Sequence, residues 1–234
     1  MRAPFILAVV ALSSTAAQPR AGAPERSSAA AAAPLDLTGY WVAFVTEDWR
    51  FRMITPRKGD YQAVPMTPEA RKIADAWDPA ADEAAGNQCK AYGAGAVMRL
   101  PARFHITWQD DNTLRVDTDA GMQTRLFHFG ARPPSPGART WQGYSTAQWD
   151  AGALKVVTAN LRSGYLRKNG VPYSENAAVT EYFDVAPLPG GGQVMLVSTI
   201  VDDPLYLQQP FITSSQFKKE ADGSKWDPTP CTAR

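Results

Sequence analysis

The chain has 234 residues, 44% of them hydrophobic and 10% aromatic, so a core of substantial size can form. Its 24 Lys and Arg residues nearly balance its 23 Asp and Glu residues, and no cationic run stands out. Nucleic-acid-binding proteins and polybasic membrane-binding proteins need a cationic face, so neither class is expected.

The first 34 residues have the composition of an export signal followed by a linker. Arg2 precedes an apolar stretch at 4–12 that is too short to span a bilayer, and the small residues at 15–17 resemble a cleavage site. Residues 18–34 are almost entirely Ala, Pro, Ser, Gly and Arg, which have little to bury. The sequence therefore predicts a signal peptide at 1–17, a disordered linker at 18–34, and one domain at 35–234 that is periplasmic or secreted. An ordinary apolar N-terminus is the alternative; no later run is long enough for an integral membrane span.

Beyond residue 38, polar and apolar residues alternate with the period of a β-strand. A first strand is expected at 39–45, and aromatic and cationic residues alternate at 49–53. One short helix is expected after Thr67, which can cap it, with Pro68 in its first turn, and it ends before Pro79. Further strands are expected at 104–108, 114–119, 122–129, 143–149, 154–161, 178–185, 194–202 and 211–219.

Eight or nine short strands with hairpin-length turns predict an all-β domain. We expect an antiparallel up-and-down β-barrel, because closure removes the exposed strand edges. A β-sandwich is the alternative. The cationic segment 165–170 (YLRKNG) is interpreted as a solvated turn at the barrel rim.

Cys89 and Cys231 are the two cysteines of the chain. In an oxidising compartment an isolated pair favours one disulfide, which would join the C-terminal tail to the segment after the predicted helix. Two unpaired buried thiols are the alternative.

The tripeptide Gly39-Tyr40-Trp41 resembles the G-x-W signature of lipocalins and other calycins. In those barrels the glycine lets the chain bend into the first strand, and the tryptophan fills the closed end. The resemblance implies these structural roles for Gly39 and Trp41. It also implies a cation–π contact between the indole and a basic residue of the last strand, Lys218 or Lys219, where the family usually has arginine.

A longer resemblance extends from Pro65 to the C-terminus. The segments MTPEARKIADAWDP, VMRLP, TWQGYS, GVPYSENAAVTEYF and VDDPLYLQQPF, together with Cys89, are similar in order and spacing to motifs of a large group of exported bacterial proteins. The group has no settled common function, so the resemblance implies export and the fold class but no chemistry. Residues 91–95 depart from the group's Pro-rich stretch, and a rim loop is expected to differ there.

Several kinds of catalytic or cofactor site are not expected. His105 and His128 lack the spacing of a metal-ligand pair, and both cysteines are assigned to the disulfide, so no metal is predicted. No glycine-rich loop opens a helix, so no nucleotide cofactor is predicted. Residues 143–147 (GYSTA) come close to the nucleophile elbow of esterases, but Ala147 replaces the required glycine and the segment has the pattern of a strand.

Titratable groups on predicted strands are the candidate catalytic residues, namely His105, Asp119, Arg125 and Glu181. His105 has the opposite phase to Phe104, Ile106 and Trp108, and it faces the lumen if those three pack against neighbouring structure. If all four candidates point inward, the low dielectric would shift their pKa values and make one of them an acid or base. In the alternative, charged residues pair on the outer wall, where each pair contributes little, and the histidines are surface or satisfied core residues.

The first functional hypothesis is a lipocalin-like barrel that binds a small hydrophobic or aromatic molecule in its lumen, because aromatic residues commonly line ligand cavities. The second is a cofactorless lyase or isomerase on such a substrate, with tyrosine hydroxyls as donors to an oxyanion. The third is an envelope protein with a filled barrel whose rim binds another protein. The ligand-binding candidates are Trp49, Phe51, Trp108, His128, Tyr144, Tyr165 and Tyr173; the sequence predicts no oligomeric state.

Overall fold

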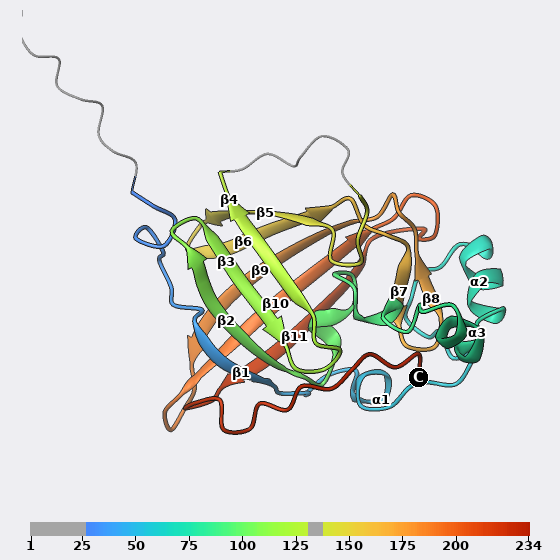
Figure 1. The fold of residues 1–234 in the computed structure, drawn as a ribbon, viewed down its shortest axis with the longest axis horizontal. Coiled ribbons are helices and arrows are strands. Elements are labelled where there is room, and N and C mark those ends of the chain that lie inside the picture. Colours follow the sequence, from blue (N-terminus) through green and yellow to red (C-terminus); the bar gives the residue numbers. More distant parts are fainter. Residues whose placement is uncertain (1–26, 131–137) are drawn as a thin grey trace, which may run out of the picture.

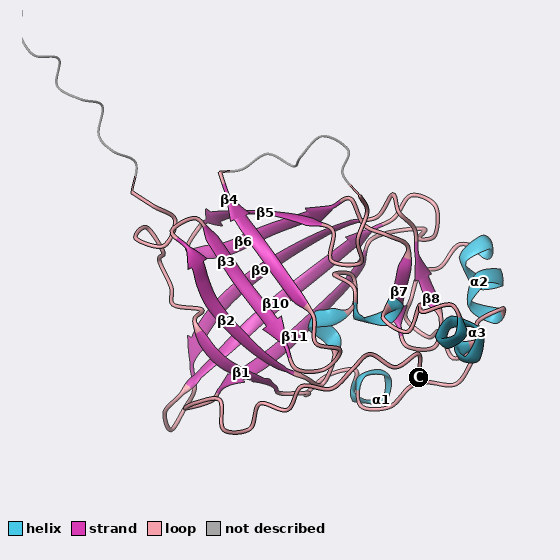
Figure 2. Cartoon of the chain, in the orientation of Figure 1, coloured by secondary structure: helices cyan, strands magenta, loops and turns pink. Residues whose placement is uncertain are grey.

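The computed structural model describes residues 27–130 and 138–234, so the predicted signal peptide lies outside the described residues. Within these ranges, nine strands close into one barrel, and short helices and a two-stranded hairpin gather at one end of it, termed the capped end (Figures 1 and 2). The predicted all-β barrel is confirmed, and the alternative β-sandwich is wrong. In the parts of the chain that the structure describes, no helix has the length and apolar character needed to cross a membrane.

The barrel strands form a mostly antiparallel sheet that closes on itself. Around the barrel the order is β1-β11-β10-β9-β6-β5-β4-β3-β2, and β1 pairs with β2 to close it. Among the barrel pairs of the described residues, only β4 and β5 run parallel, because both begin at the capped end. The predicted antiparallel up-and-down order is therefore wrong at this one connection. The strands are β1 (Gly39–Ala43), β2 (Arg103–Asp110), β3 (Thr113–Thr118), β4 (Thr124–Phe129), β5 (Tyr144–Asp150), β6 (Ala153–Ala159), β9 (Ala178–Pro187), β10 (Gln193–Asp202) and β11 (Phe211–Lys219).

The capped end contains the shorter elements. The predicted helix is present there as α2, where the Thr67 hydroxyl accepts a hydrogen bond from the Ala70 amide at 3.2 Å and Pro68 occupies the first turn. The elements are α1 (Trp49–Arg52), α2 (Pro68–Asp75), α3 (Pro79–Ala84), the 3₁₀ turns η1 (Lys90–Tyr92) and η2 (Val97–Arg99), and the hairpin of β7 (Gly164–Arg167) and β8 (Val171–Tyr173).

Two of these helices lie outside the sequence-based prediction. Asp78, expected to end the predicted helix, begins α3, because its carboxylate accepts hydrogen bonds from the amides of Ala80 and Ala81. Within residues 49–53, whose aromatic and cationic side chains alternate, Trp49–Arg52 form α1 instead of continuing the strand pattern. Arg52 at the end of α1 is buried, which brings a cation into the interior of the capped end.

Gly39 and Trp41 both lie in β1, the first strand of the barrel. The Trp41 side chain is fully buried, and its indole nitrogen donates a hydrogen bond to the Leu37 carbonyl at 2.8 Å. Lys219, not Lys218, makes the cation–π contact: its ammonium lies 4.7 Å from the indole centroid and donates to the Thr38 carbonyl. Gly39 has a φ of +98°, which a residue with a side chain rarely adopts.

Side chains from alternate positions of the strands fill the interior of the barrel, as the period-2 pattern predicts. In β2, Phe104 and Ile106 are fully buried, whereas His105 between them is half-buried. The segment that carries η1 and η2 adds Tyr92 and Met98 to the same core from the capped end. The fully buried apolar side chains of the strands include Leu114, Val116, Phe127, Leu154, Val156, Phe183, Met195, Val197 and Phe217.

The predicted disulfide between Cys89 and Cys231 is present. It holds the C-terminal tail against the capped end, where the Thr232 hydroxyl lies within hydrogen-bond distance of Lys168. At the opposite end, residues of the predicted linker pack on the barrel: Ala29 is buried, and its carbonyl accepts a hydrogen bond from the Trp149 indole at 3.0 Å. The two ends of the domain are thus both covered by chain from outside the barrel strands.

Candidate functional site

Arg125 on β4 and Glu181 on β9 form a fully buried ion pair in the lumen. The two terminal nitrogens of Arg125 donate to the two carboxylate oxygens of Glu181 at 2.9 and 2.5 Å. One of these nitrogens also donates to the Thr158 hydroxyl, which lies 2.7 Å from the Ser145 hydroxyl. The guanidinium stacks over Phe127 at 4.9 Å. Arg125 and Glu181 therefore both point into the lumen, as the prediction of catalytic residues inside the barrel requires. Their opposite charges, however, neutralise each other.

The other two candidate catalytic residues lie elsewhere. Asp119 is buried, and one of its carboxylate oxygens accepts hydrogen bonds from the amides of Arg103 and Ala120, so it holds the turn after β3. The expectation that His105 faces the lumen is wrong: its ring stacks on Tyr40 on the outer wall, with centroids 4.1 Å apart. The apolar neighbours of His105 in β2 fill the lumen, and the period of two then directs His105 outward.

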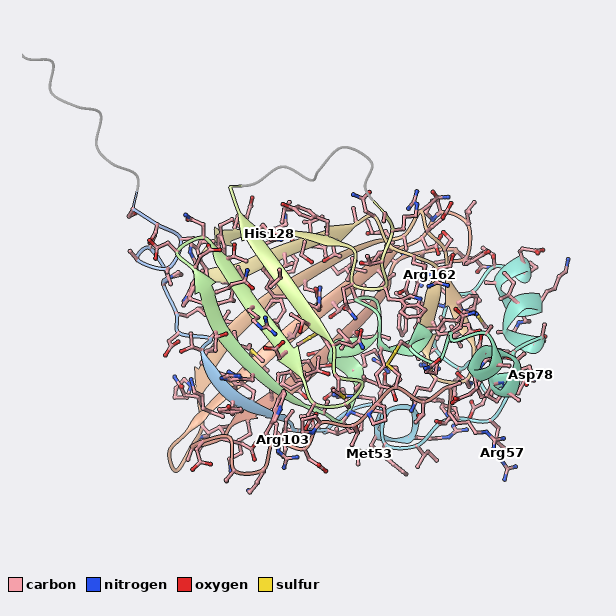
Figure 3. The ribbon with its side chains drawn as sticks, in the orientation of Figure 1. Met53, Arg57, Asp78, Arg103, His128 and Arg162 are labelled. Atoms are coloured by element: carbon pink, nitrogen blue, oxygen red, sulfur yellow. A yellow bond between two sulfur atoms is a disulfide. The ribbon has the colours of Figure 1, made fainter. Side chains whose placement is uncertain are left out.

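Of three further ligand-binding candidates, two lie on the outer wall of the barrel and one lies at the end opposite the cap. His128 lies on β4 (Figure 3), with its side chain on the outer wall. Its ring stacks there on that of Tyr144, with centroids 4.7 Å apart. Trp108 contacts Phe129 and Trp149 at the end opposite the cap, at centroid distances of 5.6 and 6.5 Å. The prediction that these residues share one luminal pocket is therefore wrong for His128 and Tyr144.

The remaining aromatic candidates are in the capped end. The Tyr165 hydroxyl donates to Asp82 at 2.7 Å, and burial together with this carboxylate raises the pKa of Tyr165. Burial also raises the pKa of Tyr173, whose hydroxyl has no hydrogen-bond partner within the described parts of the chain. Trp49 is 65% exposed, whereas the Phe51 ring lies 4.1 Å from the guanidinium carbon of Arg167. Phe51 thus contacts a cluster of charged residues, none of which was a candidate from the sequence.

Three arginines from separate segments meet in the capped end and form a cluster termed the arginine cage. Arg52 ends α1, Arg99 ends η2 and Arg167 ends β7, and their exposed fractions are 6%, 5% and 3%. The interpretation of 165–170 as a solvated turn is therefore wrong at Arg167. The guanidiniums of Arg99 and Arg167 both stack on Phe211, at 5.6 and 5.8 Å from its centroid.

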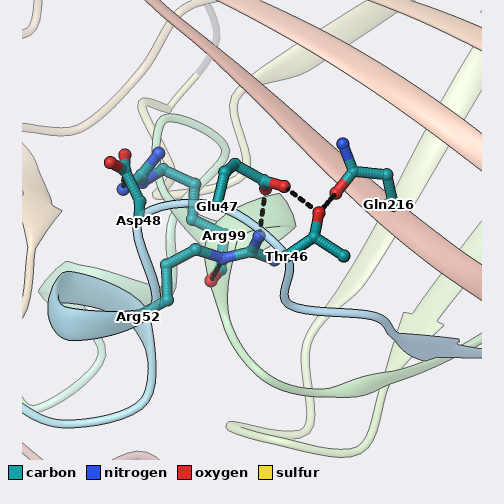
Figure 4. Close-up of polar contacts among 6 residues, drawn as sticks. All are labelled: Thr46, Glu47, Asp48, Arg52, Arg99 and Gln216. Carbon is teal, nitrogen blue, oxygen red and sulfur yellow. Dashed lines mark hydrogen bonds and ion pairs between the residues drawn. The ribbon is translucent and has the colours of Figure 1, made fainter.

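Each cage arginine has some of its donors satisfied by the chain. Arg52 forms an ion pair with Glu47 at 2.5 Å and donates from its Nε to the Arg99 carbonyl (Figure 4). Arg99 donates to the Asp48 carboxylate at 3.0 Å. Arg167 donates from Nη1 to the backbone carbonyl of residue 62 at 2.7 Å and has no ion-pair partner among the described residues.

Four buried donor nitrogens of the cage have no hydrogen-bond partner among the described residues: Nη2 of Arg52, Nη1 of Arg99, and Nε and Nη2 of Arg167. Nearly all buried polar groups in native proteins are hydrogen-bonded, so four in one cluster require an explanation. All three arginines line one cavity of about 20 Å³, which holds one to two water-sized atoms. Its other walls are mainly apolar, and they include Phe51, Leu100 and Leu166.

The cage has an excess of positive charge. Three guanidiniums face two carboxylates, those of Glu47 and Asp48, which leaves a net charge of +1. Burial and the neighbouring charge of Arg99 lower the pKa of Arg167 to about 10, against the attraction of Asp48 and Asp60. Burial also lowers the pKa of Arg52, against the attraction of Glu47. The electrostatic environment therefore favours the arrival of an anion.

Comparison with known proteins gives no match. No family model matches the sequence, and neither the curated proteins nor the solved structures contain a significant match. The fold and the site therefore define the protein only as a closed β-barrel with little helix, a filled interior and a buried cationic cluster in its cap.

Proposed function

We propose that the protein binds a small anionic molecule in the arginine cage and that the barrel is the rigid scaffold of this site. The observation that carries the proposal is the set of four unpartnered donor nitrogens on buried arginines that line one cavity. An anion would accept hydrogen bonds from these donors and offset the repulsion among three cations. Charge-assisted hydrogen bonds of this kind are about twice as strong as neutral ones.

A hollow of about 800 Å³ beside α2 and α3 is a weaker candidate for the site. Its cations, Arg57, Lys58 and Arg234, are exposed, so water already solvates them and an anion gains little there. The cage arginines, in contrast, are at most 6% exposed. Interactions of charges that are removed from water are the stronger ones.

Binding is better supported than catalysis. Both carboxylate oxygens of Glu181 accept hydrogen bonds from Arg125, so this carboxylate is not positioned to exchange a proton with a substrate. A hydrophobic ligand in the lumen would have to displace close-packed side chains, which costs free energy. The proposal therefore keeps a small-molecule-binding barrel but transfers the ligand from the lumen to the cap.

We also propose a periplasmic or secreted location and a relationship to the exported bacterial group. Support comes from the Cys89–Cys231 disulfide, since disulfides persist in oxidising compartments, and from the signal-like composition of residues 1–17.

The test is thermal unfolding of the full chain, titrated with acetate, phosphate and chloride in a zwitterionic buffer. An anion at a hundredfold excess over its Kd should stabilise the protein by about 2.7 kcal/mol, or roughly 5–10 °C in Tm. Arg99→Gln and Arg167→Gln should lose this shift. Arg50→Gln is the matched control, because Arg50 is an exposed residue of α1 outside the cage and its removal changes the net charge equally. If no anion shifts the wild-type Tm, or if the cage variants respond like the control, the proposal is wrong.

A further inference from the structure

The size of the cavity and the chemistry of its walls define the ligand of the arginine cage more closely. We infer that the cage takes the carboxylate of a monoanionic molecule whose remaining part is apolar, an inference that rests on the proposed function. The first argument is volume. A cavity of about 20 Å³ accommodates one to two water-sized atoms, which fits the two oxygens of a carboxylate better than the three free oxygens of a phosphate group.

The second argument is the match of donors, acceptors and charge. A carboxylate offers about four lone-pair sites on two oxygens, and the cage offers four unpartnered donor nitrogens. Two of these, Nε and Nη2 of Arg167, are on one guanidinium edge, the fork that binds a carboxylate in bidentate fashion. One negative charge also neutralises the net charge of the three guanidiniums and their two carboxylate partners.

The third argument is the apolar character of the remaining wall. Phe51, Leu100 and Leu166 line the cavity beside the guanidiniums, and Leu100 and Leu166 are buried. Ile54 lines the same cavity but is 65% exposed, so it marks the side that opens to solvent. A ligand with its carboxylate among the arginines would therefore place its next carbon atoms against these apolar groups and extend past Ile54.

Lys168 also lines the cavity, and its positive charge is additional to the net charge of the three guanidiniums and their two carboxylate partners. Its ammonium donates to the hydroxyls of Tyr92 and Thr232 at 3.2 Å, and the side chain is partly solvated. We assign to Lys168 the attraction of the anion toward the cavity, because solvated charges influence association more than the final bound state.

Calorimetric titration of the full chain tests the inference with acetate, butyrate, hexanoate and octanoate, with octanol as the neutral analogue, and with inorganic phosphate and chloride. Affinity should rise from acetate to the longer acids by up to roughly fourfold for each methylene that becomes buried. Octanol should bind at least tenfold more weakly than octanoate. Arg167→Gln should weaken all carboxylates.

A pair of surface variants tests the position of the apolar part without endangering the fold. Ile54→Ser should weaken octanoate severalfold more than it weakens acetate. Ile212→Ser is the matched control, because Ile212 is equally exposed, at 65%, on β11 and does not line the cavity. An equal loss of acetate and octanoate binding in Ile54→Ser would overturn the placement of the apolar part.

The outcomes separate the inference from the proposed function. Binding of phosphate or chloride without binding of carboxylates would overturn the carboxylate inference and leave an anion site. Binding of octanol as tightly as octanoate, with no effect of Arg167→Gln, would overturn both, and so would the absence of binding by any of the anions.

Discussion

Replacement of Arg167 by methionine should stabilise the ligand-free protein, which is the opposite of the usual effect of a core substitution. Arg167 is 3% exposed, stacks between Phe51 and Phe211, and has no carboxylate partner among the described residues. Methionine keeps much of the volume and the contact with the aromatic rings but removes the charge. If Arg167 is present because a ligand needs it, its buried charge is not neutralised in the ligand-free protein. Removal of Arg167 should then remove the free-energy cost of that charge.

The magnitude follows from the local electrostatics. A pKa of about 10 for Arg167 corresponds to about 2–3 kcal/mol of unfavourable charge burial, after allowance for partial screening by solvent. Because this pKa is lower in the folded than in the unfolded chain, the cost is fully present below pH 10 and is relieved only as the pH rises above that value, so a measurement at pH 7 records all of it. The variant loses about 1 kcal/mol of hydrogen bonding to an exposed backbone segment and roughly 0.5–1 kcal/mol of cation–π contact. The net gain is about 1 kcal/mol, or 2–4 °C in Tm.

The assay is urea or thermal unfolding at pH 7 in a buffer free of chloride and carboxylates, for wild type, Arg167→Met and Arg167→Lys. The lysine variant keeps the charge but loses the planar fork, so it should be less stable than wild type. A loss of stability in Arg167→Met with little change in Arg167→Lys would refute the reasoning, because it would show that the positive charge itself holds the cap together.

Three further predictions concern parts of the molecule outside the cage. Glu181→Gln should destabilise the protein by about 3–5 kcal/mol, because it leaves Arg125 buried without a counter-charge, and the double variant Glu181→Leu, Arg125→Met should recover most of that loss in urea unfolding. Cys231→Ser should cost about 2–5 kcal/mol, and the same decrease should follow addition of a reductant to wild type; an unchanged urea midpoint would contradict a closed disulfide. Lys219→Met should cost roughly 1 kcal/mol and change the fluorescence of Trp41, because it removes both the cation–π contact and the hydrogen bond to the backbone; identical emission spectra would argue against that contact.

The strands were predictable because alternation is a local property of the sequence. Phe104 and Ile106 are fully buried and His105 is not, as period two requires. Alternation gives two faces, however, and does not say which face is inward. The prediction for His105 assumed that Phe104, Ile106 and Trp108 pack against structure outside the barrel. Their face of β2 instead forms the inner wall, so His105 is on the outer face. The parallel pairing of β4 and β5 depends on where the chain re-enters the barrel, for which the sequence has no local signal.

The arginine cage was not predictable for a different reason. Arg52, Arg99 and Arg167 lie in three segments that are far apart in the sequence, and no pattern within any one segment indicates that they meet. The one local sign was the alternation of aromatic and cationic residues at 49–53, which places Phe51 and Arg52 next to each other. Burial of a charge is a property of the assembled cap, and only the tertiary structure shows it.

The two buried clusters of charge in this molecule can be compared directly, because they use the same guanidinium chemistry in one protein. In the lumen, Arg125 has a carboxylate partner that meets it with both oxygens, and the charges cancel. In the cap, three guanidiniums share two carboxylates, and four donor nitrogens lack partners in the part of the chain that the structure describes. The luminal pair leaves one buried donor, Nε of Arg125, without a partner among the described residues, whereas the cage leaves four. Each such donor costs about 1–3 kcal/mol, so the cage carries the larger cost. The unpartnered donors of the cage are on arginines that line a cavity together with apolar side chains. This coincidence is why we propose ligand binding for the cap and structural stabilisation for the luminal pair.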